Sequence, residues 1–204
     1  MQEQPPGIWR CLVHIGPEWE AAQALGAEAP CQVPLPLATR QSLAGCSSDP
    51  GTLRMLAQDS ERNVRWRVAG SPSTPVAPLT QLARDPDEGV RWGVAENPST
   101  PASALAQLAE DPMWGVRRGV AENSNTPLTI FTQLAGDPEW NVRWNVAMNP
   151  NTPASTLTQL AGDPDGGVRQ AVAESPNTPA PVLVQLAEDP EELVRRAAQR
   201  RTSP

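Results

Sequence analysis

Tryptophan and arginine recur at related positions through most of this 204-residue chain, which contains no Tyr, no Lys and a single Phe. In one column a Val-Arg pair is followed by Trp or Arg in every unit except the one with Gln170, and a second column lies four residues earlier. Trp and Arg are the side chains most enriched in binding hot spots. The candidate partner-binding residues are therefore Trp66, Trp92, Trp114, Arg118, Trp140 and Trp144.

Groups that could carry catalysis are scarce. The chain has one His, no glycine-rich phosphate loop, no Ser-His-Asp candidate and no cluster of metal ligands. Its carboxylates recur with the same period as the Trp and Arg columns, which is typical of helix caps. The sequence therefore predicts that the protein is not an enzyme and that it uses no cofactor.

Cysteine chemistry is equally limited. Cys11, Cys31 and Cys46 are 20 and 15 residues apart, an odd number of thiols without a close pair. This spacing does not fit a disulfide framework. We expect isolated thiols, and we expect the lone His14 to be an ordinary surface or core residue.

The elements that position these residues follow from a 26-residue period. The Val-Arg pairs begin at Val64, Val90, Val116, Val142, Val168 and Val194. Thr-Pro dipeptides and Gln-Leu-Ala triplets recur in the same register. Self-similarity at a fixed period of this size is the signature of a repeat protein.

Each unit contains signals for two short helices. Asp85 and Pro86 combine an N-cap acceptor with a proline at the first helical position. The first helix then runs to Asn97, which can take the left-handed conformation at a helix C-terminus. By the same logic, Thr100 and Pro101 begin the second helix.

The second helix carries Leu105, Leu108 and Ala109 at the i, i+3, i+4 spacing of an apolar stripe. A helix pair this short cannot bury its apolar face alone, so neighbouring units must stack on one another. The sequence therefore predicts an all-α fold, an α-solenoid with a right-handed or gently twisted superhelix.

The repeats do not cover the whole chain. Residues 60–204 form regular units, and residues 37–59 form a worn first unit in which Arg40 and Ala44 fit the pattern if one residue is deleted. Residues 1–36 do not fit, and we expect them to form a separate N-terminal capping region.

A helical wheel divides the first helix into faces. Val90 and Val94 point into the core, and the mostly small residues at the Gly93 position lie on a flank where units approach closely. Arg91 lies on the other flank, where it can bridge to an Asp of the next unit or contact a phosphate. Trp92 lies opposite the Val stripe, on the outer face, and has no structural role in this scheme.

With the motif D-P-x-x-x-V-R-x-x-V-A-x-N-P-x-T-P-x-x-x-L-x-Q-L-A in view, the chain resembles the leucine-rich-repeat variant family of bacteria. The resemblance covers about four fifths of the chain. It implies a superhelix in which α-helices alternate with 3₁₀-like helices, and it implies no common activity. Some members carry an N-terminal [4Fe–4S] module, which would need four ligands. Here only Cys11, Cys31, Cys46 and His14 are available, at spacings that favour isolated thiols.

Composition limits the partners. A net charge of −7 argues against a dedicated nucleic-acid or anionic-membrane binder. No signal peptide and no transmembrane stretch is evident, so we expect a cytoplasmic location. The Arg-only, Ala- and Pro-rich usage is typical of a bacterial genome with high GC content.

These observations favour a non-enzymatic scaffold that binds a protein or an extended peptide along the Trp and Arg columns. Four acids are candidates for the rim of that surface, namely Glu88, Glu96, Glu110 and Glu122. The Trp residues could instead stack on one another and stiffen the array. Two other functions stay open. One is an iron–sulfur redox or sensing protein. The other is nucleic-acid binding through what we call the Arg column, the Arg of each Val-Arg pair, namely Arg65, Arg91, Arg117, Arg143, Arg169 and Arg195.

Overall fold

The computed structural model describes residues 35–202, and every regular element in that range is an α-helix. The helices are α2 (Leu37–Cys46), α3 (Pro50–Leu56), α4 (Arg62–Gly70), α5 (Val76–Leu82), α6 (Glu88–Glu96), α7 (Ala102–Leu108), α8 (Trp114–Glu122), α9 (Leu128–Leu134), α10 (Trp140–Met148), α11 (Ala154–Leu160), α12 (Gly166–Glu174), α13 (Ala180–Leu186) and α14 (Glu192–Thr202). None of them is long and apolar enough to cross a membrane.

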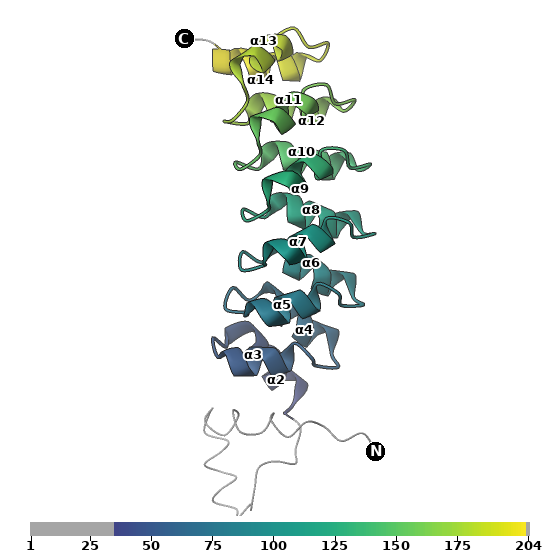
Figure 1. Ribbon diagram of the computed structural model, residues 1–204, viewed down its shortest axis with the longest axis vertical. Helices are drawn as coiled ribbons and strands as arrows, with labels where there is room; N and C mark the ends of the chain where they lie inside the picture. Colours follow the sequence, from purple (N-terminus) through teal and green to yellow (C-terminus); the bar gives the residue numbers. More distant parts are fainter. Residues whose placement is uncertain (1–34, 203–204) are drawn as a thin grey trace, which may run out of the picture.

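The helices form pairs that stack along one long axis (Figure 1). The first helix of each unit packs most extensively against the first helices of the neighbouring units, as α6 does against α4 and α8. The seven-residue second helices, such as α5 and α7, form the other layer. The predicted all-α solenoid is confirmed.

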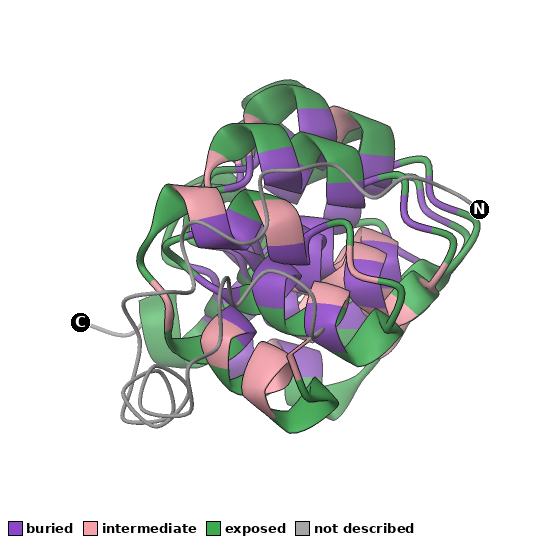
Figure 2. Ribbon diagram, turned by 90° about the horizontal axis from the view of Figure 1, so that it is seen from below, coloured by how far each residue is buried: buried purple, intermediate pink, exposed green. Residues whose placement is uncertain are grey.

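The core lies between the two layers and runs the length of the stack (Figure 2). Val90 and Val94 are fully buried in the first layer, as the helical wheel predicted. Leu105, Leu108 and Ala109 are buried from the second layer. Because each unit repeats this pattern, one continuous apolar core crosses every unit boundary of the described stack.

Adjacent first helices approach closely where small residues line the flank. A Cβ atom added at Gly93 would lie 3.2 Å from the Ala69 Cβ, and one at Gly119 would lie 3.0 Å from the Ala95 Cβ. Both contacts are tighter than ordinary van der Waals packing. The predicted role of this flank in close packing is therefore confirmed.

The Arg column is a structural ladder. Arg91 donates from Nε to Asp111 Oδ2 at 2.6 Å and from Nη2 to Asp111 Oδ1 at 3.1 Å. Its Nη1 donates to the backbone oxygen of Asp85 at 2.8 Å. The same bidentate pair recurs at Arg65, Arg117, Arg143 and Arg169 with the Asp twenty residues later. In the first unit Arg40 pairs with Asp59, nineteen residues later.

The ladder explains why the predicted start of the first helix is wrong. Helix α6 begins at Glu88 with Asp87 as its N-cap, and the Asp87 side chain accepts from the N–H groups of Gly89 and Val90. Asp85 is buried instead, where it accepts from Arg65 and from the Asp87 N–H. A buried aspartate that accepts two hydrogen bonds from a guanidinium stabilises the fold more than the same aspartate would as a helix N-cap.

The predicted left-handed conformation of Asn97 is also wrong. Asn97 is extended, with φ −70° and ψ 123°, and it is buried. Its Nδ2 donates to the backbone oxygens of Ala69 and Ser71 in the preceding unit, at 2.6 and 2.7 Å. Asn123 and Asn149 repeat the contact. This column is a second ladder between units, built from amide donors and the carbonyls at the ends of first helices.

The second helices are α-helices rather than the 3₁₀-like helices that the resemblance implied. In α5, Leu79 N donates to Pro75 O and Ala83 N donates to Leu79 O, both with the four-residue offset of an α-helix. The three-residue offset appears in the turn that follows, where Asp85 N donates to Leu82 O at 3.0 Å. The same offset occurs at the first turn of some second helices, as where Ala104 N donates to Pro101 O at 2.9 Å, so the tightening is confined to helix ends.

Candidate binding surface

Six residues make up the surface that we call the Trp/Arg strip, and four successive first helices carry them. Helix α4 carries Trp66, α6 carries Trp92, α8 carries Trp114 and Arg118, and α10 carries Trp140 and Trp144. Four of the indoles are exposed, with Trp66 at 44%, Trp114 at 40%, Trp140 at 48% and Trp144 at 36% of their full area. The predicted position of these four on an outer face agrees with the structure.

Trp92 differs from the other four. Its side chain is half-buried and packs against the apolar core. The indole N–H donates to the Glu96 carboxylate one turn later, and Trp92 Cδ1 lies 3.4 Å from the position that a Cβ on Gly119 would take. The prediction that Trp92 has no structural role is therefore wrong, because the absence of a side chain at Gly119 lets the ring lean onto α8.

Trp114 and Arg118 form one stacked unit on α8. The Arg118 guanidinium carbon lies 5.7 Å from the centre of the Trp114 ring, within the range of a cation–π contact. Arg118 Nε also lies 3.2 Å from Glu122 Oε1, as a charge pair without hydrogen-bond alignment. Ring and carboxylate together hold the guanidinium in place, four residues from each partner.

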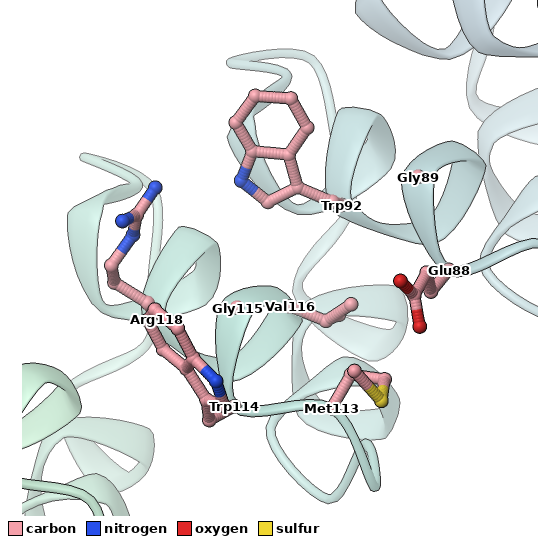
Figure 3. A pocket seen from close by; sticks show the side chains of 8 residues that line it. All are labelled: Glu88, Gly89, Trp92, Met113, Trp114, Gly115, Val116 and Arg118. Atoms are coloured by element: carbon pink, nitrogen blue, oxygen red, sulfur yellow. The ribbon is translucent and has the colours of Figure 1, made fainter.

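A pocket of about 300 Å³ opens between α6 and α8 where the strip crosses from one helix to the next. Figure 3 shows Trp92 on one side, Trp114 with Arg118 on a second, and Glu88 with Met113 on a third. The remaining lining residues are Gly89, Gly115 and Val116. The pocket thus brings together three of the six predicted residues and one predicted rim acid.

The other predicted residues lie outside the pocket. Trp140 and Trp144 are i, i+4 neighbours on α10, and Trp66 lies on α4. Of the remaining rim acids, Glu96 and Glu122 lie at the C-terminal ends of α6 and α8, and Glu110 lies in the turn after α7. The strip therefore continues on both sides of the pocket.

Met113 is a pocket residue that the sequence analysis missed. It is 37% exposed and precedes Trp114 directly. The signal was present in the repeat: the equivalent positions in the other units are acidic in every case. They are Glu61, Asp87, Glu139, Asp165 and Glu191. An apolar residue in an otherwise acidic column marks a place where the unit departs from its scaffold role.

Negative charge accumulates beside the pocket. Burial and the neighbouring Glu122 carboxylate raise the pKa of the Glu96 carboxyl above its ordinary value. Arg118 and the Trp92 N–H oppose this rise but do not cancel it. Two carboxylates, Glu96 and Glu122, thus share a single cation at this end of the two helices.

We expect Glu96→Gln to stabilise the protein at pH 7 and to have no effect at about pH 3.5. A carboxyl whose pKa is raised in the folded state binds its proton more tightly when folded, so its ionised form weakens folding at neutral pH. That weakening disappears once the carboxyl is protonated in both states, which a neutral Gln mimics. Urea unfolding at the two pH values measures the difference.

The control for this change is Glu188→Gln, which alters the net charge equally in an exposed turn three units away. An equal gain from Glu96→Gln at both pH values would contradict the expectation, because it would show that the effect does not depend on ionisation.

Few side chains in the described residues could support the two alternative functions, nucleic-acid binding and an iron–sulfur centre. In five of the six Val-Arg pairs the guanidinium has an Asp partner and the Arg side chain is only 11–14% exposed, namely at Arg65, Arg91, Arg117, Arg143 and Arg169. They are therefore not placed to contact a nucleic-acid backbone. Cys46 is exposed and unpaired, while Cys11, Cys31 and His14 lie outside the described residues. In residues 35–202 no group of three or more His, Cys, Asp or Glu could hold a metal ion.

Comparisons with known proteins agree with this architecture. The family model described as "leucine rich repeat variant" matches residues 88–113, 140–165 and 166–191. A solved structure described as "a leucine-rich repeat variant with a novel repetitive protein structural motif" is 27% identical, with a TM-score of 0.65. That match covers 94% of this chain and 79% of the solved one. A search of curated protein sequences gave no significant match.

Designed repeat proteins are more distant. A designed armadillo repeat protein in complex with the peptide (KR)4 is 15% identical, with a TM-score of 0.39 over 95% of this chain and 96% of that one. A computationally designed armadillo repeat protein is 16% identical, with a TM-score of 0.33 over 79% of this chain and 88% of that one.

Proposed function

This chain belongs to the leucine-rich-repeat variant family, and from that premise we propose that it is a non-enzymatic scaffold that binds an extended segment of another protein along the Trp/Arg strip. The observation that carries the proposal is the pocket between α6 and α8, whose walls include Trp92, Trp114 and Arg118. Concave sites with aromatic walls and few polar groups are typical of ligand recognition.

The exposed area supports the proposal. Four indoles between 36% and 48% exposed present about 100 Å² each, since a Trp side chain has an area of about 250 Å². Their sum is several hundred Å², which is the size of the apolar patches that mark interaction sites. Because successive first helices are about 8–10 Å apart, this area forms an elongated track.

Stiffening of the array by the Trp residues has less support. Within residues 35–202 no Trp of the strip stacks on another Trp, and the ring contact of the strip is the one between Arg118 and Trp114. Trp92 does contribute to packing, but Trp66 and Trp140 keep nearly half of their area in solvent. Exposed indoles stabilise the packing between repeats only weakly. They can stabilise a complex strongly, because a partner that covers them excludes water from the interface.

We expect Trp114→Ala to weaken the binding of partner peptides by about 30-fold, the loss expected of a hot-spot residue worth about 2 kcal/mol. Partners are first selected from a displayed library of random 12-residue peptides. Their dissociation constants for the wild type and the variant are then measured by fluorescence polarisation.

The matched control is Leu128→Ala, which removes an exposed apolar side chain from the second-helix layer, outside the strip. It is expected to bind as the wild type does. Equal binding by Trp114→Ala would overturn the proposal. A loss of far-UV circular dichroism at the binding temperature in both Trp114→Ala and Trp144→Ala would support stiffening instead.

A further inference from the structure

We infer that the segment bound by the strip is cationic, and that one of its Arg or Lys side chains enters the pocket between α6 and α8 with Glu88 as its counter-charge. This inference rests on the proposed function, because it names the chemistry of the partner at the same surface. It is carried by an acid that makes no hydrogen bond and no ion pair within the described residues, in a pocket with aromatic walls.

Glu88 lies in the pocket with no hydrogen bond and no ion pair to any residue of the described chain. The charge of Arg91 acts on it at longer range, but the Arg91 guanidinium forms its ion pair with Asp111. Figure 3 shows its carboxylate directed from α6 towards the space between the two helices. The equivalent acid of the last unit, Glu192, forms an ion pair with Arg196 one turn later. At Glu88 the residue one turn later is Trp92, so the position of the missing cation is taken by an indole.

The one cation that lines the pocket is already neutralised. Arg118 stacks on Trp114 and pairs with Glu122, and its charge also acts on Glu96. Glu88 lines the same pocket, so this part of the strip has three carboxylates, Glu88, Glu96 and Glu122, for the one guanidinium of Arg118. The Arg column adds no free positive charge, since Arg91 and Arg117 on α6 and α8 each have a bidentate Asp partner. The local field therefore favours a cation.

The size and the walls of the pocket fit a single basic side chain. A volume of about 300 Å³ is at the lower end of the range of ligand sites, too small for a folded element. Trp92 and Trp114 provide indole rings, which attract a guanidinium or ammonium group by about 0.5–2 kcal/mol depending on desolvation. The apolar wall that Met113 adds fits the methylene stem of such a side chain.

The strip also sets a spacing for the partner. Successive first helices are about 8–10 Å apart and an extended chain rises about 3.3 Å per residue, so one unit corresponds to about two to three residues of the partner. On this spacing the residues that flank the pocket-bound cation reach Trp66 on one side and Trp140 or Trp144 on the other. We expect apolar or aromatic side chains at those places.

The test uses the same displayed library of random 12-residue peptides, and then a synthetic peptide that represents the selected sequences together with a copy in which each Arg and Lys is replaced by Gln. The selected sequences are expected to be rich in Arg or Lys. Glu88→Gln is expected to weaken the cationic peptide about tenfold and to leave the affinity of the Gln copy unchanged. Glu188→Gln, with the same change in net charge three units away, is expected to bind both peptides as the wild type does.

Three outcomes are distinguishable. Cationic peptides that depend on both Trp114 and Glu88 support the inference. Neutral or acidic peptides that depend on Trp114 but not on Glu88 overturn the inference and leave the proposed function standing. A library that yields no Trp114-dependent peptide overturns both.

Discussion

Replacing Arg117 by Ala is expected to lower the free energy of unfolding by about 3–5 kcal/mol. Arg117 donates to both carboxylate oxygens of Asp137, at 2.6 and 3.0 Å, and to the backbone oxygen of Asp111 at 2.7 Å. The Asp137 side chain is only 4% exposed. The hydrogen bond to Asp137 raises the pKa of the Arg117 guanidinium, as expected for a charged pair. Without Arg117 the Asp137 carboxylate stays buried with its charge uncompensated.

Urea unfolding followed by circular dichroism measures this effect, and the chain contains a matched control. Glu192 and Arg196 also form an ion pair, but on the surface of α14, with side chains 63% and 67% exposed. Arg196→Ala is expected to cost less than about 1 kcal/mol, because exposed ion pairs contribute little. The double variant Arg117→Ala with Asp137→Ala should recover part of the loss, since it removes the orphaned charge. Equal effects of Arg117→Ala and Arg196→Ala would contradict the expectation.

Much of the fold could be predicted because residues at the same position of each repeat have the same structural role. The period identifies the Val and Leu positions that must be buried. It also predicts that the recurring Arg of one unit pairs with the recurring Asp of the next, because their charges are opposite. Arg40 and Asp59 show the limit of this logic, since the pair persists with nineteen residues between its members where the later units have twenty.

The predictions from the sequence that proved wrong concern residues that contact a neighbouring unit. A helical wheel gives the direction of Trp92 on its own helix, but it holds no information on Gly119 of the next unit, over which the ring leans. Asp85 and Asn97 have the local signals of caps, and both use their side chains to reach another unit instead. The pocket was out of reach for the same reason, because Glu88 and Trp114 come from different units.

The residues of the candidate site could be predicted from the sequence only where they differ from the residues that the repeat has at the same position. Trp114 and Trp140 stand out because scaffold positions do not require an indole, and that reasoning holds for Met113 in its acidic column as well. What the repeat could not show is which of these residues share a cavity. That depends on Gly89 and Gly115, whose missing side chains leave the space open.

Asn123→Ala is expected to lower the free energy of unfolding by about 1–3 kcal/mol, since it leaves the backbone oxygen of Ala95 without a donor. Asn97 O loses one of its two donors and keeps the Thr100 N–H. Asn123 Nδ2 donates to the backbone oxygens of Ala95 and Asn97 at 2.8 and 2.9 Å. Ala95 lies in the last turn of α6, where carbonyls have no intrahelical partner. As a control, Asn125→Ala removes an exposed amide that donates to Pro98 O and is expected to cost about 1 kcal/mol or less.

The same ladder predicts a gain in the free energy of unfolding at a unit where another residue replaces the Asn. Ser175 occupies the Asn position in its unit, is buried, and its hydroxyl has no hydrogen-bond partner. An Asn at that position has the backbone oxygens of Ala147 and Asn149 at the offsets that Asn123 uses. Ser175→Asn is therefore expected to stabilise the protein by about 1–2 kcal/mol in urea unfolding, opposite in sign to Asn123→Ala. If Ser175→Asn does not raise the free energy of unfolding although Asn123→Ala lowers it, the Asn ladder stabilises the central units more than the C-terminal ones.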